Sequence, residues 1–268
     1  MITFKSFLKE SEEKAPLPKT KEDTEKALWE FEDCIEGGIA NCEIVDTAFG
    51  PAVKVKGNVN LRALSLEYLP FRFHTVTGDF NCSMNKELKS IEGAPKWVKG
   101  NANFEHCWSL KNLDFLALIG FQCDATVSFS HCKDLERICE TGKMLYTGTC
   151  IMSDCEMLTS VKGLGTIFGN LNITGTSITS LHNFHKDAEF GKNSSGGLIL
   201  FNGSKAQLIE ECGLNLMMVK GLKEITYSMR NDSHKWCEIV EKGIQDSMDI
   251  IDVQDALLEA GLDKQAKI

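Results

Sequence analysis

The stretch GDFNCSMNKELKSI, residues 78–91, decides the fold because its pattern recurs along the chain. We aligned the recurrences on one small residue in each, called the anchor. The anchors are spaced by 21, 22, 25, 23 and 21 residues, and they are Gly57, Gly78, Gly100, Ala125, Gly148 and Gly169. Internal periods of this length indicate a repeat protein in which successive coils stack into a solenoid.

Apolar residues occupy fixed offsets from the anchors. They are Val55, Val76, Val98, Cys123, Tyr146 and Ile167 two residues before, Val59, Phe80, Ala102, Val127, Cys150 and Leu171 two residues after, and Leu61, Cys82, Phe104, Phe129, Met152 and Ile173 four residues after. A period of two is typical of a strand with one buried face. The columns therefore predict one short parallel strand in each coil of 21–25 residues.

A second set of columns predicts the turn that follows each strand. Seven residues after the anchor, the last five coils have Asn85, Cys107, Cys132, Cys155 and Thr176. We expect these side chains to lie at a tight turn and to bond inward to backbone groups of the neighbouring coil. The next apolar columns are Leu88, Leu110, Leu135, Leu158 and Ile178, and then Ile91, Leu113, Ile138, Val161 and Leu181.

These strings resemble a known family. The sequence GDFNC at residues 78–82, continuing to LKSIEGAP at 88–95, is similar to a leucine-rich-repeat variant common in proteins of large tailed bacteriophages. The resemblance covers roughly residues 53–227. The segments VQDALLEAGL (253–262) and MITFKSFL (1–8) are similar to the helical ending and the amino terminus of such phage proteins. The resemblance implies a leucine-rich-repeat-like α+β solenoid of phage origin.

A solenoid exposes an apolar cross-section at each end and needs terminal caps, so we expect helical caps at both ends. The predicted organisation is a flexible amphipathic leader and linker (1–19), an N-terminal helical cap (20–52), the solenoid (53–203) and a C-terminal helical cap (204–268). Within the first cap we expect an amphipathic helix over 20–36 with Leu28, Trp29, Phe31 and Ile35 on its apolar face, followed by a strand over 43–55. A short helix after Ser204 and one or two helices over 232–260 are expected in the second.

The composition of the chain disfavours several classes of binding partner. The net charge of −9 disfavours binding to nucleic acid or to an anionic membrane, and no apolar run has the length of a membrane span. Eleven cysteines without a C-x-x-C pair argue against a disulfide framework, and six of them fall on inward columns. A reduced protein in the host cytoplasm is the expectation.

The sequence contains only weak matches to catalytic motifs. The glycines follow the solenoid period and form no phosphate-binding loop. His106 and His131 lie one coil apart, yet two histidines make an incomplete zinc shell, so we expect no metal site and no cofactor. Cys212 and Cys237, the latter near His234, leave a cysteine-dependent enzyme as the least favoured alternative.

The best candidate binding residues are those that the repeat does not require. Met84, His106, Trp108, His131 and Lys133 sit at turn offsets, and we expect Trp108 to be substantially exposed as an interface anchor. The outward-facing strand residues Asn81 and Asn103 join this set. The resulting prediction is a non-enzymatic phage protein that binds and inhibits or sequesters a host protein, with a defence protein as the suspected target.

The leader supplies an alternative function. Residues 1–10 are similar to leaders that direct internal head proteins into phage capsids, and Leu8-Lys9-Glu10 would provide the processing site. In that case the protein is packaged and its location is the virion interior.

Overall fold

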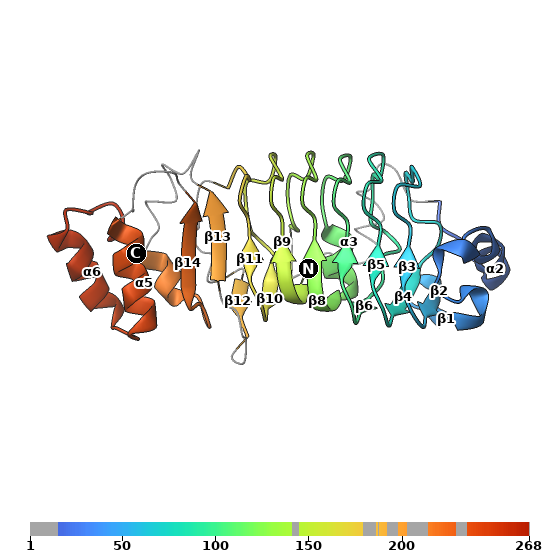
Figure 1. The fold of residues 1–268 in the computed structure, drawn as a ribbon, viewed down its shortest axis with the longest axis horizontal. Coiled ribbons are helices and arrows are strands. Elements are labelled where there is room, and N and C mark those ends of the chain that lie inside the picture. Colours follow the sequence, from blue (N-terminus) through green and yellow to red (C-terminus); the bar gives the residue numbers. More distant parts are fainter. Residues whose placement is uncertain are drawn as a thin grey trace.

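The chain forms an elongated β-solenoid of about six coils with parallel strands and a few helices, as the repeat predicted (Figure 1). The computed structural model describes residues 16–140, 145–178, 186, 188–191, 198–202, 214–228 and 235–267. Its helices are α2 (Lys21–Glu30), α3 (Asp114–Ile119), α5 (Lys235–Gln245) and α6 (Ile250–Glu259), with 3₁₀ turns η1 (Glu32–Cys34) and η2 (Gly38–Asn41). Its strands are β1 (Cys42–Thr47), β2 (Gly50–Val55), β3 (Val59–Asn60), β4 (Phe73–Val76), β5 (Phe80–Asn81), β6 (Trp97–Val98), β7 (Ala102–Asn103), β8 (Gln122–Ser128), β9 (Leu145–Ile151), β10 (Gly165–Ile167), β11 (Leu171–Asn172), β12 (Ala188–Phe190), β13 (Leu198–Asn202) and β14 (Glu224–Ser228).

The first coils have two strand segments each, where the sequence predicted one. One segment precedes the anchor and the other follows it, so that β4 pairs with β6 while β5 pairs with β7. The two segments join into one strand in β8 and in β9. The pairing of β8 with β9 shifts register between Cys123 and Thr126, around Ala125, the one anchor that is not glycine.

Close stacking of the backbone explains the glycine anchors. A Cβ atom added at Gly100 would lie 2.8 Å from the carbonyl carbon and oxygen of Gly78, and one added at Gly78 would meet Gly57 at 2.7–2.8 Å. The amide of Gly78 donates to the carbonyl of Gly57 at 3.0 Å, and that of Gly100 to Gly78 at 3.1 Å. Consecutive coils thus touch through their main chains at these two anchors, which leaves no room for a side chain.

The inward columns form one continuous core, with one correction: Tyr146 is 50% exposed, and the buried Thr147 pairs with Cys123 and Ile167 in its place. A row of phenylalanine rings runs along it, with centroids 5.1 Å apart for Phe73–Phe80 within one coil, 5.7 Å for Phe80–Phe104 and 5.2 Å for the parallel rings of Phe104–Phe129. The six cysteines assigned to inward positions are all buried. The predicted bonding of the turn column to the neighbouring coil is confirmed for its cysteines, because the thiols of Cys107, Cys132 and Cys155 donate to the carbonyls of Cys82, Phe104 and Phe129 at 3.4, 3.3 and 3.1 Å. The Thr176 hydroxyl instead donates to the Ile173 carbonyl of its own coil at 2.8 Å.

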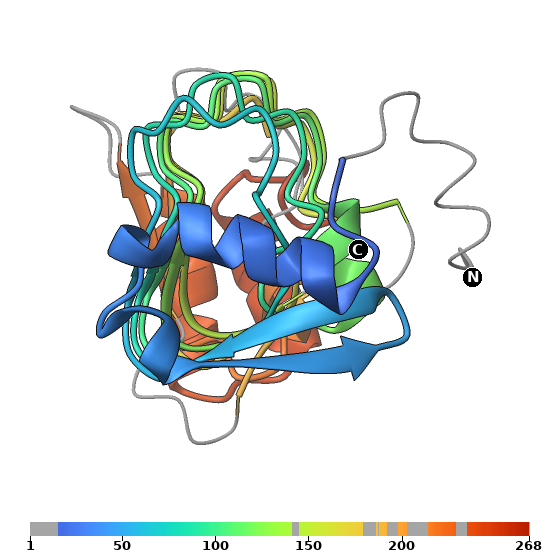
Figure 2. The same cartoon turned by 90° about the vertical axis from the view of Figure 1, so that its right-hand side faces the viewer.

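The N-terminal end departs from the expected elements. The helix α2 ends at Glu30, and the chain continues as the 3₁₀ turn η1 rather than as helix to residue 36. Trp29 is 63% exposed, so its assignment to the buried face was wrong. The predicted strand over 43–55 is an antiparallel hairpin, β1–β2, because the chain reverses between Thr47 and Gly50, where Gly50 has φ +111°. Figure 2 shows α2 and this hairpin across the end of the coils.

At the other end the parallel sheet continues past residue 203, since β13 pairs with β14. The helices α5 and α6 lie in the region predicted to be helical. The leader at residues 1–15 and the helix expected after Ser204 lie outside the described residues. Within the described ranges, no helix is long and apolar enough to cross a membrane.

Candidate functional site

Five of the seven candidate residues lie along a row of stacked turns that we call the turn ridge, defined by the residues six and eight positions after each anchor; the other two, Asn81 and Asn103, end the strands β5 and β7 before it. The six-position column has a left-handed backbone in every coil, with φ between 57° and 70°. Its members are Ala63, Met84, His106, His131, Asp154 and Gly175. Figure 1 shows the turns beyond the strands aligned along one edge of the solenoid.

Hydrogen bonds within and between coils shape each turn. The Asn81 side-chain oxygen accepts from the Ser83 amide at 3.1 Å, and Asn103 accepts from Glu105 in the same way at 2.8 Å. Asn81 and Asn103 therefore help to start the turns that lead to Met84 and His106. Both asparagines are half-buried.

The residues with a left-handed backbone conformation also form backbone hydrogen bonds to the next coil. The amide of Met84 donates to the carbonyl of Glu105 at 2.7 Å, and the amides of His106 and His131 donate to Ser130 and Ser153 at 2.9 Å. Backbone hydrogen bonds between coils therefore hold the main chain of the ridge at each of these residues.

The imidazoles of the ridge stack on each other. The rings of His106 and His131 lie parallel within 5°, with centroids 4.6 Å apart. Next to them, Nε2 of His131 is 3.8 Å from Oδ2 of Asp154, and Nη2 of Arg62 contacts the Met84 sulfur at 3.0 Å. Arg62 and Asp154 were not among the predicted binding residues, although Asp154 has the same offset from its anchor as the two histidines.

Trp108 is half-buried, which corrects the expectation that it is substantially exposed. The Nζ atoms of Lys86 and Lys133 lie 4.2 and 4.9 Å from the centre of its ring. All three residues lie eight positions after their anchors, so coil stacking brings a lysine against the ring from each neighbouring coil. The buried Nε1 of Trp108 has no hydrogen-bond acceptor among the described residues. Lys86 could have been identified from the sequence, because it has the same offset from its anchor as Trp108 and Lys133.

Comparison of the chain with protein-family models, with curated proteins and with solved structures finds no match.

Across the described part of the chain, no group of three or more His, Cys, Asp or Glu residues is placed to hold a metal ion. Burial raises the pKa of the Cys123 thiol to about 11 and that of Cys155 to about 12, so these thiols are protonated at neutral pH and poor nucleophiles. Cys237 is buried in α5, and Cys212 lies outside the described residues.

Proposed function

We propose that this chain is a non-enzymatic binding protein that engages a protein partner through the turn ridge. The supporting observation is the occupancy of the left-handed column by Met84, His106 and His131, at φ of 57–62°. For a residue with a Cβ atom this conformation costs roughly 1 kcal/mol. Gly175 occupies the same position in the last of these coils, so the turn itself does not need a large side chain. We infer that the larger side chains serve the surface.

The composition of the ridge favours a protein as the partner. Trp108 is half-buried with the amino groups of Lys86 and Lys133 over its ring, and Met84 is exposed on the same ridge. Aromatic residues, methionine and arginine are enriched in protein interfaces, and a surface that is rigid before binding loses little conformational entropy when it binds. Net charge −9 disfavours nucleic acid and anionic membranes.

The same proposal assigns the coils to the leucine-rich-repeat type and the terminal helices to caps. Coil lengths of 21–25 residues and the buried turn residue Asn85 support the repeat type. At one end α2 packs on β1 and β2 and buries Leu28. At the other end α5 packs on β14 and buries Trp236 and Val240.

The role that we propose is a phage-encoded inhibitor that sequesters a host defence protein in the host cytoplasm. The support is the sequence resemblance over residues 53–227 and at both termini, together with a ridge suited to binding.

Capture from a bacterial lysate with quantitative mass spectrometry tests the proposal. Trp108→Ala is expected to reduce a stoichiometric protein partner at least about tenfold, because central tryptophans dominate interface energies. Trp29→Ala is the matched control, since Trp29 is exposed on α2, away from the turn ridge. The affinity of the purified partner, measured by calorimetry, should follow the same order. Equal loss with both variants, no loss with Trp108→Ala, or empty capture by folded protein would contradict the proposal.

A further inference from the structure

A pocket of about 300 Å³ lies between the β1–β2 hairpin and α3, separate from the turn ridge. Both elements are departures from the repeat. The hairpin precedes the first complete coil, and α3 lies in the 25-residue interval between Gly100 and Ala125, the longest between two anchors. Figure 2 shows the tip of the hairpin beside α3, outside the outline of the stacked coils. The two irregular segments thus meet and enclose a space that a regular solenoid would not have.

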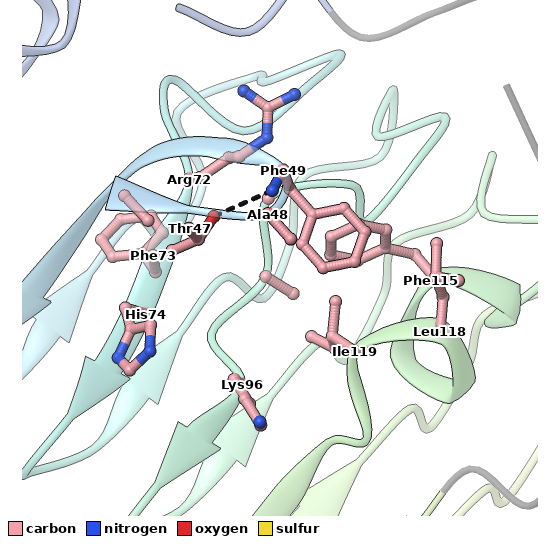
Figure 3. Close-up of a pocket in the computed structure, with 13 residues that line it drawn as sticks. Thr47, Ala48, Phe49, Arg72, Phe73, His74, Lys96, Phe115, Leu118 and Ile119 are labelled. Carbon is pink, nitrogen blue, oxygen red and sulfur yellow. Dashed lines mark hydrogen bonds between the residues drawn. The ribbon is translucent and has the colours of Figure 1, made fainter. Parts of the chain in front are cut away.

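The walls of the pocket are mostly apolar. Phe49 at the hairpin turn approaches Phe115 of α3 edge-to-face, with ring centroids 6.1 Å apart. Leu118 and Ile119 add the rest of the α3 side, as Figure 3 shows. The buried residues Phe73 and Ala94 also line the pocket, along with Ala48 and Ala52.

Three basic side chains line the pocket on the side of the coils, namely Arg72, His74 and Lys96. Figure 3 places His74 and Lys96 together, while the guanidinium of Arg72 points away from them. Arg72 is already engaged, because it donates to the Pro18 carbonyl at 3.0 Å and pairs with Glu92 at 3.2 Å. Lys96, by contrast, has no ion-pair partner among the described residues and is exposed.

The local charge around His74 is positive. Burial and the neighbouring ammonium groups of Lys54 and Lys96 lower the His74 pKa, and Glu43 opposes them with a smaller effect. Nδ1 of the ring is 2.9 Å from the Thr75 hydroxyl. A negatively charged group near His74 and Lys96 would pair with the Lys96 ammonium and raise the pKa of His74.

We propose that this pocket binds a small apolar monocarboxylate. The apolar tail occupies the space between Phe49 and α3, and the carboxylate faces Lys96 and His74. A volume at the lower end of the range for ligand pockets limits the tail to medium length. This site would function independently of the turn ridge and of its protein partner.

Titration of the full chain with octanoate, followed by ligand-observed NMR, tests the proposal. A ligand of this size is expected to bind with a Kd of about 1 mM or below. Octan-1-ol, which has the same tail without the charge, should bind more weakly. The His74 imidazole, which Lys54, Lys96 and Glu43 face, should titrate at higher pH when octanoate is bound.

Substitutions distinguish the contribution of the charged side of the pocket from that of its apolar side. Lys96→Gln should weaken octanoate about two- to fivefold, as expected for an exposed charge pair, and leave octan-1-ol unchanged. Lys99→Gln is the matched control, because Lys99 lies over the Trp97 ring and does not line the pocket. Ile119→Trp, or Ile119→Phe if the larger ring unfolds the chain, should fill the pocket and abolish binding of both ligands.

Three results would overturn the proposal. The first is the absence of saturable octanoate binding up to about 10 mM, ten times the expected constant. The second is unchanged octanoate binding in a folded Ile119 variant. The third is equal affinity for octanoate and octan-1-ol with no effect of Lys96→Gln, which would reassign the pocket to an uncharged group such as an apolar side chain of a partner.

Discussion

The anchor column and the turn ridge repeat the same backbone in coil after coil, yet they differ in which residues they accept. Five of the six anchors are glycine. The left-handed position of the ridge has five residue types in six coils, although glycine would suit its backbone best. The two columns are only six residues apart in each coil.

The two columns accept different residues because their side chains would point to different surroundings. At the anchor a side chain would run into the main chain of the preceding coil, as the 2.8 Å approach at Gly100 indicates. At the ridge the side chains of Met84, His106 and His131 are accessible to solvent, so the only penalty is local backbone strain. Positions with the same residue in most coils therefore indicate where the coils stack closely. Positions whose residue varies between coils reflect the function of the surface.

Substitution at the anchor should have the largest effect on stability. Gly100→Ala is expected to lower the free energy of unfolding by about 3 kcal/mol, because the new methyl group overlaps the Gly78 carbonyl and neither main chain can move alone. Urea denaturation followed by circular dichroism measures the change.

A second glycine separates the clash from backbone strain. Gly120 has φ +63°, and a Cβ atom there would meet nothing within 4 Å. Gly120→Ala should therefore cost only about 1 kcal/mol. Equal losses at Gly100 and Gly120 would mean that coil stacking does not select the anchor.

The buried turn residue should give an intermediate effect. Asn85 is fully buried, donates to the carbonyls of Leu61 and Cys82 at 2.9 Å each, and accepts from the Leu66 amide at 3.1 Å. Asn85→Ala removes these three hydrogen bonds, of which only the Cys82 carbonyl keeps another donor, the Cys107 thiol, and should cost about 2 kcal/mol.

Asn85→Cys, the residue of the next three coils at this offset, keeps one donor and should cost less. Thermal unfolding of both variants makes the comparison. A cysteine variant as unstable as the alanine variant would contradict the idea that this column is held by its inward hydrogen bonds.

Local periodicity was sufficient to predict the solenoid and much of its interior. The inward cysteines and the bonding of the turn column depend on offsets of a few residues, which the sequence displays directly. The ridge residues Met84, His106 and His131 were selected for the same reason, since they occupy offsets that the repeat leaves free.

Features that depend on the approach of distant segments were not predictable in this way. Trp108 was expected to be exposed because its own coil does not cover it, but Lys86 and Lys133 from the adjacent coils do. The pocket requires Phe49 of the hairpin to meet Phe115 of α3, and no periodic pattern links these residues.

The smallest expected effect tests the basis of the ridge argument. At φ +58°, His131→Gly should relieve backbone strain, whereas His131→Ala removes the same imidazole and retains the strain. The glycine variant is therefore expected to be more stable than the alanine variant by about 0.5–1 kcal/mol, the reverse of the order at Gly100. Urea denaturation of the two variants measures this difference as a shift in the midpoint, provided that their m-values are equal. Equal stability would mean that the left-handed turn imposes no penalty on larger side chains, and their presence on the ridge would then no longer indicate a function.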